Sequence, residues 1–356
     1  MSGLETMTKQ TSPYQKRRYA AEKGGSKMTA SERIRAIIKG ERADRLPVIE
    51  WAPWWDQTVN NWLGQGLPAE AARSVYSLQE HFGLDKCIQT LFHARTSETP
   101  VAPSHGAGII KNEADYEKIR PTMYKEPYLP REYIDWLKKT HDDGDTIHFF
   151  TVEGFFWMPR ELLGIEEHLY SFYDSPELLK RICEDHLGWL KKVVDYIGNT
   201  FKFDFMSFAE DMSYNLGPML SKECFDEFLL PYYRAIIPGI KALDTPVFID
   251  SDGDITAAVD WYGEAGADGM FPLERQAGVD VSVYIEKHPE MTFLGHYDKM
   301  VMHKGEAAMR AEFERLMPSA RKGRLIIAVD HQTPPAVSYE DYQLFVKLFK
   351  EYACAL

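Results

Sequence analysis

The chain has 356 residues, 44% of them hydrophobic, which is enough to bury the core of one large α/β barrel or of two ordinary domains. Its 41 lysines and arginines stand against 54 aspartates and glutamates, and the net charge of −13 argues against a nucleic-acid or anionic-membrane partner. No apolar run reaches membrane-spanning length, and the N-terminus lacks the apolar core of a signal peptide. The cysteines show no paired spacing, so we expect reduced thiols in a cytoplasmic protein: Cys87, Cys183, Cys224 and Cys354.

Residues 1–27 are polar and basic and carry no periodic apolar face, so they are predicted to be a disordered extension. The folded part is predicted to begin at Met28, because Thr29-Ala30-Ser31-Glu32 is a capping-box pattern ahead of an amphipathic run. That Met28 is the native start is a hypothesis that N-terminal sequencing of the native protein tests. We expect residues 28–356 to form a single domain.

Short apolar runs alternate with longer helical patterns along this domain, and helices are predicted to start at Ser175-Pro176 and after Ser221. Strands that alternate with helices imply parallel pairing with right-handed crossovers, so about eight such units predict a (β/α)8 TIM barrel. The G-x-G-x-x-G turn of a doubly wound sheet is absent from the sequence. The predicted strands are Leu46–Trp51, Lys86–Thr90, Thr146–Val152, Phe203–Phe208, Pro246–Ile249, Gly269–Leu273, Thr292–Leu294 and Leu325–Val329.

The segment Asp250-Ser251-Asp252-Gly253-Asp254 directly follows one of these strands. Ionised carboxylates are expensive to bury unpaired, and Asp250 and Asp252 point to the same side of an extended backbone. Two carboxylates that close need a cation or a shared proton. We therefore expect Asp250 and Asp252 to be functional, whereas Asp254 has the alternative role of capping the next helix.

Acids follow nearly every predicted strand, at the end of the barrel where active sites lie. The alternative is that roughly half of them are solvated or cap helices. His331 is a candidate general acid/base or metal ligand, and His296 is either a site residue or part of the scaffold. The strand-end acids are Glu50, Glu153, Glu210 with Asp211, Glu274, Asp298 and Asp330.

Aromatic residues cluster after two predicted strands: Trp51, Trp54 and Trp55 after the first, and Phe155, Phe156 and Trp157 after the third. Core packing is the default role of such residues. Two tryptophan-rich loops at one barrel face would also build an apolar wall for a planar or bulky ligand.

Four segments carry a family resemblance. They are Gly40-Glu41-Arg42-Ala43-Asp44-Arg45-Leu46-Pro47-Val48, Ser221–Phe225 with Leu230-Pro231-Tyr232-Tyr233, Ala265-Gly266-Ala267-Asp268-Gly269, and Thr333-Pro334 to Tyr342. In their order and spacing they make most of Met28–Leu356 similar to the uroporphyrinogen decarboxylase superfamily. That superfamily includes haem-pathway decarboxylases and corrinoid-dependent methyltransferases, and the resemblance implies its TIM-barrel fold.

The chain departs from both branches at the expected site. Decarboxylases carry an arginine-rich R-Q-A-G-R-Y segment that grips the substrate carboxylates, but Glu50–Asp56 contains no arginine and would repel a polycarboxylate. The methyltransferases bind zinc through an H-x-C pair and a late cysteine. Asp250 and Asp252 stand in place of that pair, and His331 falls near the cysteine. Carboxylates in place of thiolates argue against zinc activation of a thiol and indicate a divergent subgroup.

The resemblance implies a methyltransferase-type enzyme that passes a methyl group from a small O- or N-methylated substrate to a corrinoid on a partner protein. Asp250, Asp252 and His331 would bind a divalent metal ion, zinc or another, or act as acid and base, and Asp330 and Glu210 complete the predicted catalytic set. Glu153 and Glu210 would also orient the substrate. The predicted substrate-binding residues are Glu50, Trp51, Trp55, Glu153, Trp157, Glu274 and His296.

Two alternatives stay open at this point. One is a carboxy-lyase that decarboxylates a tetrapyrrole or a smaller acid. The other is a non-catalytic homologue that binds a ligand or docks a corrinoid protein. The sequence does not fix the oligomeric state, and a dimer is one option.

Overall fold

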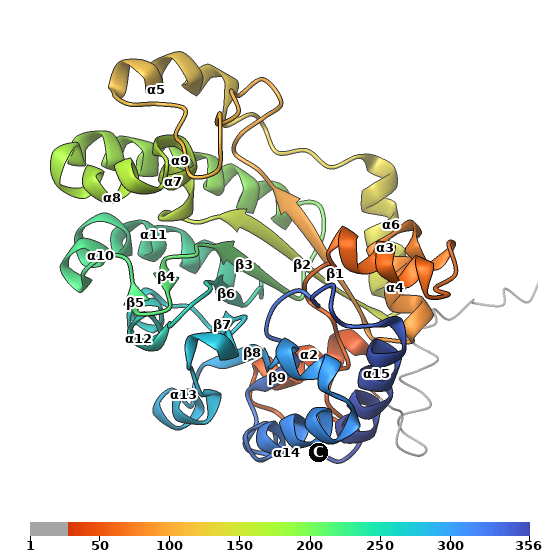
Figure 1. Ribbon diagram of the computed structural model, residues 1–356. Coiled ribbons are helices and arrows are strands. Elements are labelled where there is room, and N and C mark those ends of the chain that lie inside the picture. The colour runs from red at the N-terminus through yellow and green to blue at the C-terminus, as the bar shows by residue number, and fades with distance from the viewer. Residues whose placement is uncertain (1–27) are drawn as a thin grey trace, which may run out of the picture.

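The computed structural model describes residues 28–356, so the predicted disorder of residues 1–27 lies outside the described part. Seven strands form one parallel sheet in the order β1-β2-β3-β6-β7-β8-β9, and helices surround the curled sheet (Figure 1). The strands are β1 (Lys86–Phe92), β2 (Thr146–Glu153), β3 (Phe205–Ala209), β6 (Val247–Asp250), β7 (Gly269–Phe271), β8 (Thr292–Tyr297) and β9 (Leu325–Val329). A separate two-stranded hairpin pairs β4 (Ser213–Tyr214) with β5 (Gly217–Pro218).

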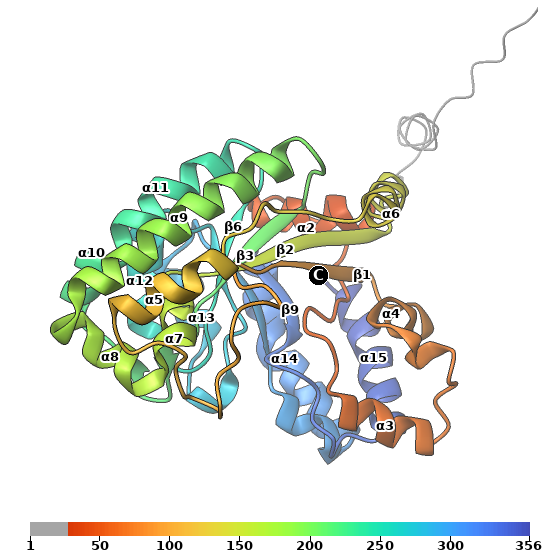
Figure 2. The same cartoon turned by 90° about the horizontal axis from the view of Figure 1, so that it is seen from above.

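Figure 2 shows α9, α10 and α11 along one side of the sheet and α14 and α15 on the other. Among the helices of residues 28–356, none combines the length and the apolar character needed to cross a membrane. The helices are α2 (Ala30–Ile38), α3 (Asp56–Gly64), α4 (Val75–Phe82), α5 (Glu113–Ile119), α6 (Arg131–Asp142), α7 (Trp157–Leu163), α8 (Ile165–Asp174), α9 (Pro176–Gly198), α10 (Lys222–Phe228), α11 (Leu230–Lys241), α12 (Thr256–Ala265), α13 (Val281–Lys287), α14 (Glu306–Lys322) and α15 (Tyr339–Ala353).

The predicted α/β barrel class is confirmed, with one strand fewer than expected. The prediction of a strand over Leu46–Trp51 is wrong, because this buried segment forms no ladder with either edge of the sheet. It nevertheless contacts both edges: the Asp85 amide donates to the Val48 carbonyl (2.9 Å), and the Trp51 indole donates to the Val329 carbonyl (3.0 Å). Pro47 has no amide hydrogen, and the Val48 amide donates to the Asp85 carboxylate (2.8 Å), so side-chain bonds replace a ladder here.

The helix starts agree with the sequence signals. Thr29 and Glu32 form the predicted capping box of α2, with the Glu32 amide donating to the Thr29 hydroxyl (3.1 Å). Ser175 precedes α9, which has Pro176 in its first turn. Ser221 caps α10 by accepting from the Cys224 amide (3.2 Å).

The inner face of the sheet changes character from the core toward the carboxyl ends of the strands. Phe149 and Phe205 stack with ring centroids 4.6 Å apart, in the apolar core. One level higher the Thr151 and Ser207 hydroxyls share a hydrogen bond of 2.7 Å. The last level aligns Glu153 of β2 with Ala209 of β3 and Asp250 of β6. In-register residues of parallel strands point to the same face, so the sheet ends in a row of acids with a small residue between them.

We predict that Asp85→Ala lowers the free energy of unfolding by roughly 3 kcal/mol, because it removes the carboxylate that pairs with Arg45 and Arg33 and accepts from the Val48 amide. Asp85 pairs with Arg45 (2.6 Å) and with Arg33 (3.6 Å), whose side chain is only 3% exposed. Urea denaturation measures the loss. Asp226→Ala, which removes an exposed partner of Lys222, is the control and should cost less than about 1 kcal/mol. Equal losses in the two variants would contradict the structural role of Asp85.

Candidate functional site

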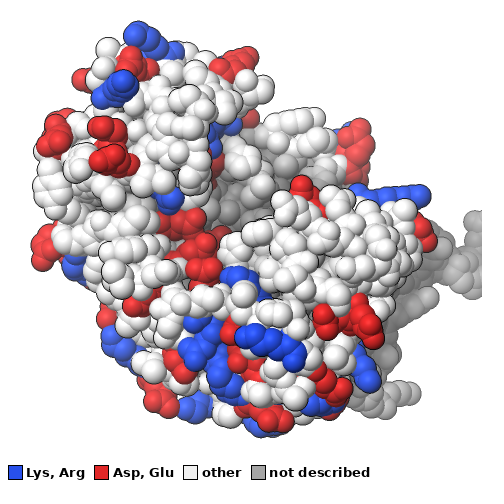
Figure 3. All heavy atoms as spheres, in the orientation of Figure 1, with Lys and Arg blue, Asp and Glu red and all other residues white. Residues whose placement is uncertain are grey.

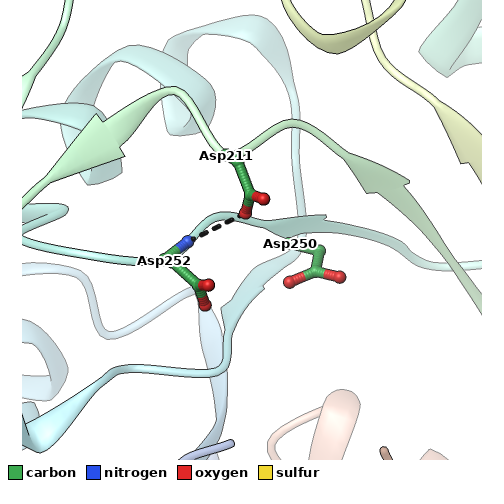
Figure 4. Close-up of side chains that lie close together, drawn as sticks. All are labelled: Asp211, Asp250 and Asp252. Atoms are coloured by element: carbon green, nitrogen blue, oxygen red, sulfur yellow. Dashed lines mark hydrogen bonds between the residues drawn. The ribbon is translucent and has the colours of Figure 1, made fainter. Parts of the chain in front are cut away.

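Three aspartates come together at the carboxyl ends of β3 and β6 (Figure 4). One carboxylate oxygen from each of Asp211, Asp250 and Asp252 lies within 4.8 Å of the other two. The Asp252 amide donates to the Asp211 carboxylate (3.3 Å). Asp211 has a φ of 42°, in the left-handed region, and this backbone turn directly follows β3. The structure thus brings Asp250 and Asp252 together as predicted and adds Asp211.

The three carboxyl groups lie in an environment that disfavours their charge. Burial is the largest effect that raises the pKa of Asp252 to about 7, and the negative charges of Asp211 and Glu274 act in the same direction. Burial and the charges of Asp211 and Asp252 raise the pKa of Asp250 well above its usual value. Burial likewise raises the pKa of Asp211. The cluster therefore favours a bound cation or a retained proton.

The residues of this cluster fit a divalent metal ion. Carboxylate oxygens are the ligands that hard cations prefer, and the Asp250 carboxylate accepts no hydrogen bond from any residue in 28–356. His331 Nε2 lies 3.7 Å from an Asp252 oxygen. Burial and the Lys299 charge lower the pKa of His331, which keeps the imidazole neutral near pH 7. A neutral imidazole is the form that can ligate a metal.

Asp330, Glu274 and Lys299 form a charged network beside the aspartates. Asp330 is fully buried and accepts from the amides of Arg275 (2.9 Å) and Lys299 (3.2 Å). The Lys299 ammonium lies 3.3 Å from Glu274 and 3.6 Å from Asp330. Glu274 in turn accepts from the Gly253 amide (3.3 Å), inside the aspartate segment. Burial raises the pKa of Asp330 to about 6. Through its bonds to the Arg275 and Lys299 amides, Asp330 positions the loops beside the aspartates.

The Glu210 carboxylate accepts its hydrogen bonds from backbone amides. These are the amides of Phe155 (3.1 Å), Phe156 (2.9 Å) and Trp157 (2.9 Å), at the start of α7. A Cβ on Gly154 would lie 2.2 Å from this carboxyl carbon, so only glycine leaves room for it. Burial raises the pKa of Glu210 to about 8, although the three amides act against the shift. The structure places Glu210 as a helix cap behind the site.

His296 occupies the scaffold position that the sequence left as one of two options. Its Nδ1 donates to the Leu273 carbonyl (2.9 Å), and its Nε2 accepts from the Val281 amide (3.2 Å) and lies 3.1 Å from the Arg315 guanidinium. Burial lowers the pKa of His296 to about 4. Within residues 28–356, none of these partners belongs to the aspartate cluster.

Asp254 takes the capping role that the sequence left open, since its carboxylate accepts from the Thr256 amide (2.9 Å) at the start of α12. The two interpretations of the D-x-D-G-D segment are thus divided among its members. Asp250 and Asp252 belong to the carboxylate cluster, and Asp254 caps the next helix.

The three predicted tryptophans differ in how they relate to the aspartates. Trp51 packs edge-on against Phe271 (4.8 Å between centroids) and His331 (6.4 Å). Trp157 lies under the Arg160 guanidinium (4.8 Å), which also donates to the Asp211 carbonyl (3.2 Å). Trp55 precedes α3 and is 41% exposed, and within residues 28–356 it makes no hydrogen bond to the cluster. Trp51 therefore contacts His331 directly, Trp157 is linked to Asp211 only through Arg160, and the apolar wall for a ligand stays a prediction.

Glu153 contacts His93, which is not among the predicted site residues. Its carboxylate lies 2.8 Å from Nδ1 of His93, which directly follows β1. Burial acts to raise the pKa of Glu153, but the His93 hydrogen bond and the neighbouring His186 hold it below its usual value. The predicted strand ended at Thr90, three residues short of His93, so the strand-end signal was missed.

Figure 3 shows a hollow in the face that carries the strand ends, with acidic atoms gathered along its wall. A curled parallel sheet that is surrounded by helices is a TIM-barrel-like α/β fold, and the carboxylate cluster lies at the carboxyl ends of its strands. The sequence profile described as uroporphyrinogen decarboxylase (URO-D) matches residues 162–352, more than half of the chain. The protein belongs to the uroporphyrinogen decarboxylase family.

One solved structure supports the fold. A methyltransferase from Methanosarcina mazei superposes with a TM-score of 0.63 at 14% identity, covering 92% of this chain and 99% of that one. A putative vitamin-B12-independent methionine synthase from Listeria monocytogenes gives a TM-score of 0.45 at 12% identity, over 87% and 97% of the two chains. A B12-independent methionine synthase from a Shewanella species gives 0.48 at 12% identity, over 87% and 92%. No curated protein sequence matches the chain.

The buried glutamate before the aromatic loop gives a pH prediction. Tyr342 donates to Glu50 (2.7 Å), and burial raises the pKa of Glu50 to about 8. A carboxyl whose pKa is raised on folding contributes stability below its unfolded pKa and loses it as pH rises through the folded pKa. The free energy of unfolding of the wild type, measured relative to that of Glu50→Gln, should therefore fall by on the order of 4 kcal/mol between about pH 4.5 and pH 8.

Urea denaturation of the wild type and Glu50→Gln at several pH values measures this difference. Glutamine keeps an acceptor for the Tyr342 hydroxyl, so the packing is conserved. The exposed Glu340→Gln is the control and should show no such trend. A constant difference between wild type and Glu50→Gln across the range would contradict the burial of a neutral Glu50.

Proposed function

We propose that this family member is a methyltransferase-type enzyme. It takes a methyl group from a small O- or N-methylated substrate at the mouth of the barrel and passes it to a corrinoid held by a partner protein. The observation that carries the proposal is the Asp211, Asp250 and Asp252 cluster, a concentration of negative charge at the carboxyl ends of the strands. Such a cluster suits a neutral or cationic substrate.

The charges around the cluster argue against a polycarboxylate substrate. Glu274 and Asp330 add negative charge, and Lys299 is already paired with both. Three nearby arginines have partners too: Arg95 pairs with Glu161 (2.6 Å), Arg160 covers the Trp157 ring, and Arg275 donates to the Val279 carbonyl (2.9 Å). The described mouth therefore holds no group of free cations that could grip several carboxylates.

Asp211, Asp250 and Asp252, with His331 beside them, would hold the metal ion. A bound divalent cation would supply positive charge that polarises the substrate heteroatom. Trp51 supplies an apolar contact next to His331 and can exclude water from the methyl group.

A second candidate is a carboxy-lyase, which the description of the matching family favours. In that reaction a carboxylate of the cluster would stabilise positive charge that develops on the substrate. The two candidates require opposite substrate charge, so a direct assay separates them. Incubation with uroporphyrinogen should give no decarboxylated product if the methyltransferase proposal is correct.

The main test uses the full chain with free cob(I)alamin as the acceptor and anisole, methanol and tetramethylammonium as methyl donors. Formation of methylcobalamin is followed by visible absorption. Asp250→Asn keeps the shape of the side chain and removes its charge, so we expect transfer to fall about 100-fold.

Asp254→Ser is the matched control, since serine also caps a helix and Asp254 lies in the same segment. This variant should keep nearly full activity. Full activity in Asp250→Asn, or turnover of uroporphyrinogen by the wild type, would contradict the proposal.

A further inference from the structure

The sheet register places a second polar pair on the same level as the aspartate cluster. Glu153 aligns with Ala209, and Ala209 with Asp250, so the two acids lie two strands apart on the same face. Adjacent strands are about 4.8 Å apart, which puts the backbones of Glu153 and Asp250 roughly 10 Å apart. Ala209, which lies between them, carries only a methyl side chain and is partly exposed.

The pair consists of a buried carboxylate and an accessible imidazole. The His93 side chain is 56% exposed and that of Glu153 only 6%, with 2.8 Å between Nδ1 and the carboxylate. Within residues 28–356, His93 Nε2 has no hydrogen-bond partner. One imidazole nitrogen is thus oriented by a carboxylate, and the other is free for a ligand.

Glu153 is held firmly from several sides. The Ala94 amide donates to its carboxylate (3.4 Å), and His186 of α9 lies 2.8 Å from its carbonyl oxygen. The other charge facing His93 is Arg95, which is itself paired with Glu161 of α7. An orienting group that is fixed in this way keeps the imidazole in one tautomer and one position.

Two apolar residues near this pair are accessible. Leu91 lies on the inner face of β1, in register with Thr151, and is 50% exposed despite its place in a strand. Ala209 is also partly exposed. A ligand over Ala209 has the Glu153 and His93 pair on one side and Asp250 on the other.

We propose that His93, oriented by Glu153, is the proton donor to the leaving heteroatom of a substrate that lies across Ala209. This inference rests on the proposed methyl transfer and assigns the proton that such a reaction needs. As the bond from the heteroatom to the methyl carbon breaks, its electron pair stays on the heteroatom. The Nε2 proton of His93 moves to that atom, and the methyl carbon receives an electron pair from the corrinoid nucleophile of the proposed reaction.

The charge balance of the pair agrees with this role. The hydrogen bond to Glu153 raises the pKa of His93, while burial and Arg95 oppose that shift. A raised pKa increases the protonated fraction of His93 near neutral pH. A methyl ether needs this proton because it leaves as an alkoxide or phenoxide, whereas a quaternary ammonium leaves as a neutral amine and needs none.

The leaving-group dependence gives the decisive experiment. With anisole as donor, His93→Gln should slow methyl transfer about 100-fold, because general acid catalysis contributes on that order. With 4-nitroanisole, whose phenoxide is stable without a proton, and with tetramethylammonium, the same variant should change the rate less than about threefold. His81→Gln is the matched control, since His81 is also exposed but hydrogen-bonded to the neutral Tyr339 hydroxyl (2.7 Å). It should leave all three rates unchanged.

Two measurements separate this inference from the proposed function. Proton NMR of the protein alone should show that Glu153→Gln lowers the pKa of His93 and leaves that of His81 unchanged. Binding of 4-nitrophenolate, followed by its absorption, should weaken about tenfold in His93→Gln and in Ala209→Leu, which fills the space between the two acids. If the wild type transfers no methyl group but both results hold, the proposed function fails and the ligand site remains.

Equal slowing of all three donors by His93→Gln would overturn the proton-donor role, because a merely structural residue affects every substrate alike. Unchanged 4-nitrophenolate binding in both variants would overturn the placement of the substrate. An unchanged pKa of His93 in Glu153→Gln would overturn the role of the glutamate.

Discussion

The in-register pairing of β2, β3 and β6 positions the polar groups of the mouth. Parallel strands that are aligned residue by residue carry equivalent side chains to the same height, so Glu153, Ala209 and Asp250 form one row. A shift of one residue in β6 would turn Asp250 toward the helices and bring Ile249 into the mouth. The apolar side chains below the row support this register, because Phe149 and Phe205 stack at matching heights on neighbouring strands.

This register concentrates negative charge where water is partly excluded. Burial and the neighbouring carboxylates raise the pKa values of Asp250 and Asp252, and the Lys299 charge opposes part of the rise at Asp252. The repulsion among these carboxylates destabilises the folded state, and a cation or a proton that binds there stabilises it. The network of Asp330 and Glu274 fixes the surrounding loops, so the aspartates have little freedom to separate.

The sequence predicted much of the fold because the alternation of strands and helices is a strong periodic signal. It failed at Leu46–Trp51, where apolar content resembles a strand but Pro47 and the Asp85 carboxylate replace ladder bonds. Asp250 and Asp252 were predictable because strand alternation alone places them on one side. Whether an acid at a strand end is free or bonded to backbone amides depends on tertiary contacts, so Glu210 could not be recognised as a cap. His93 was missed because β1 extends beyond the predicted end.

The most direct test of the account is the location of Mn²⁺ by anomalous diffraction, in crystals of the wild type and of Asp250→Asn grown with the ion. Mn²⁺ prefers oxygen ligands, so it reports on a carboxylate site of this kind. The account predicts an anomalous peak among Asp211, Asp250 and Asp252 in the wild type, and none there in the variant. A wild-type map without a peak at the cluster, at saturating Mn²⁺, would contradict the claim that these three carboxylates form a cation site.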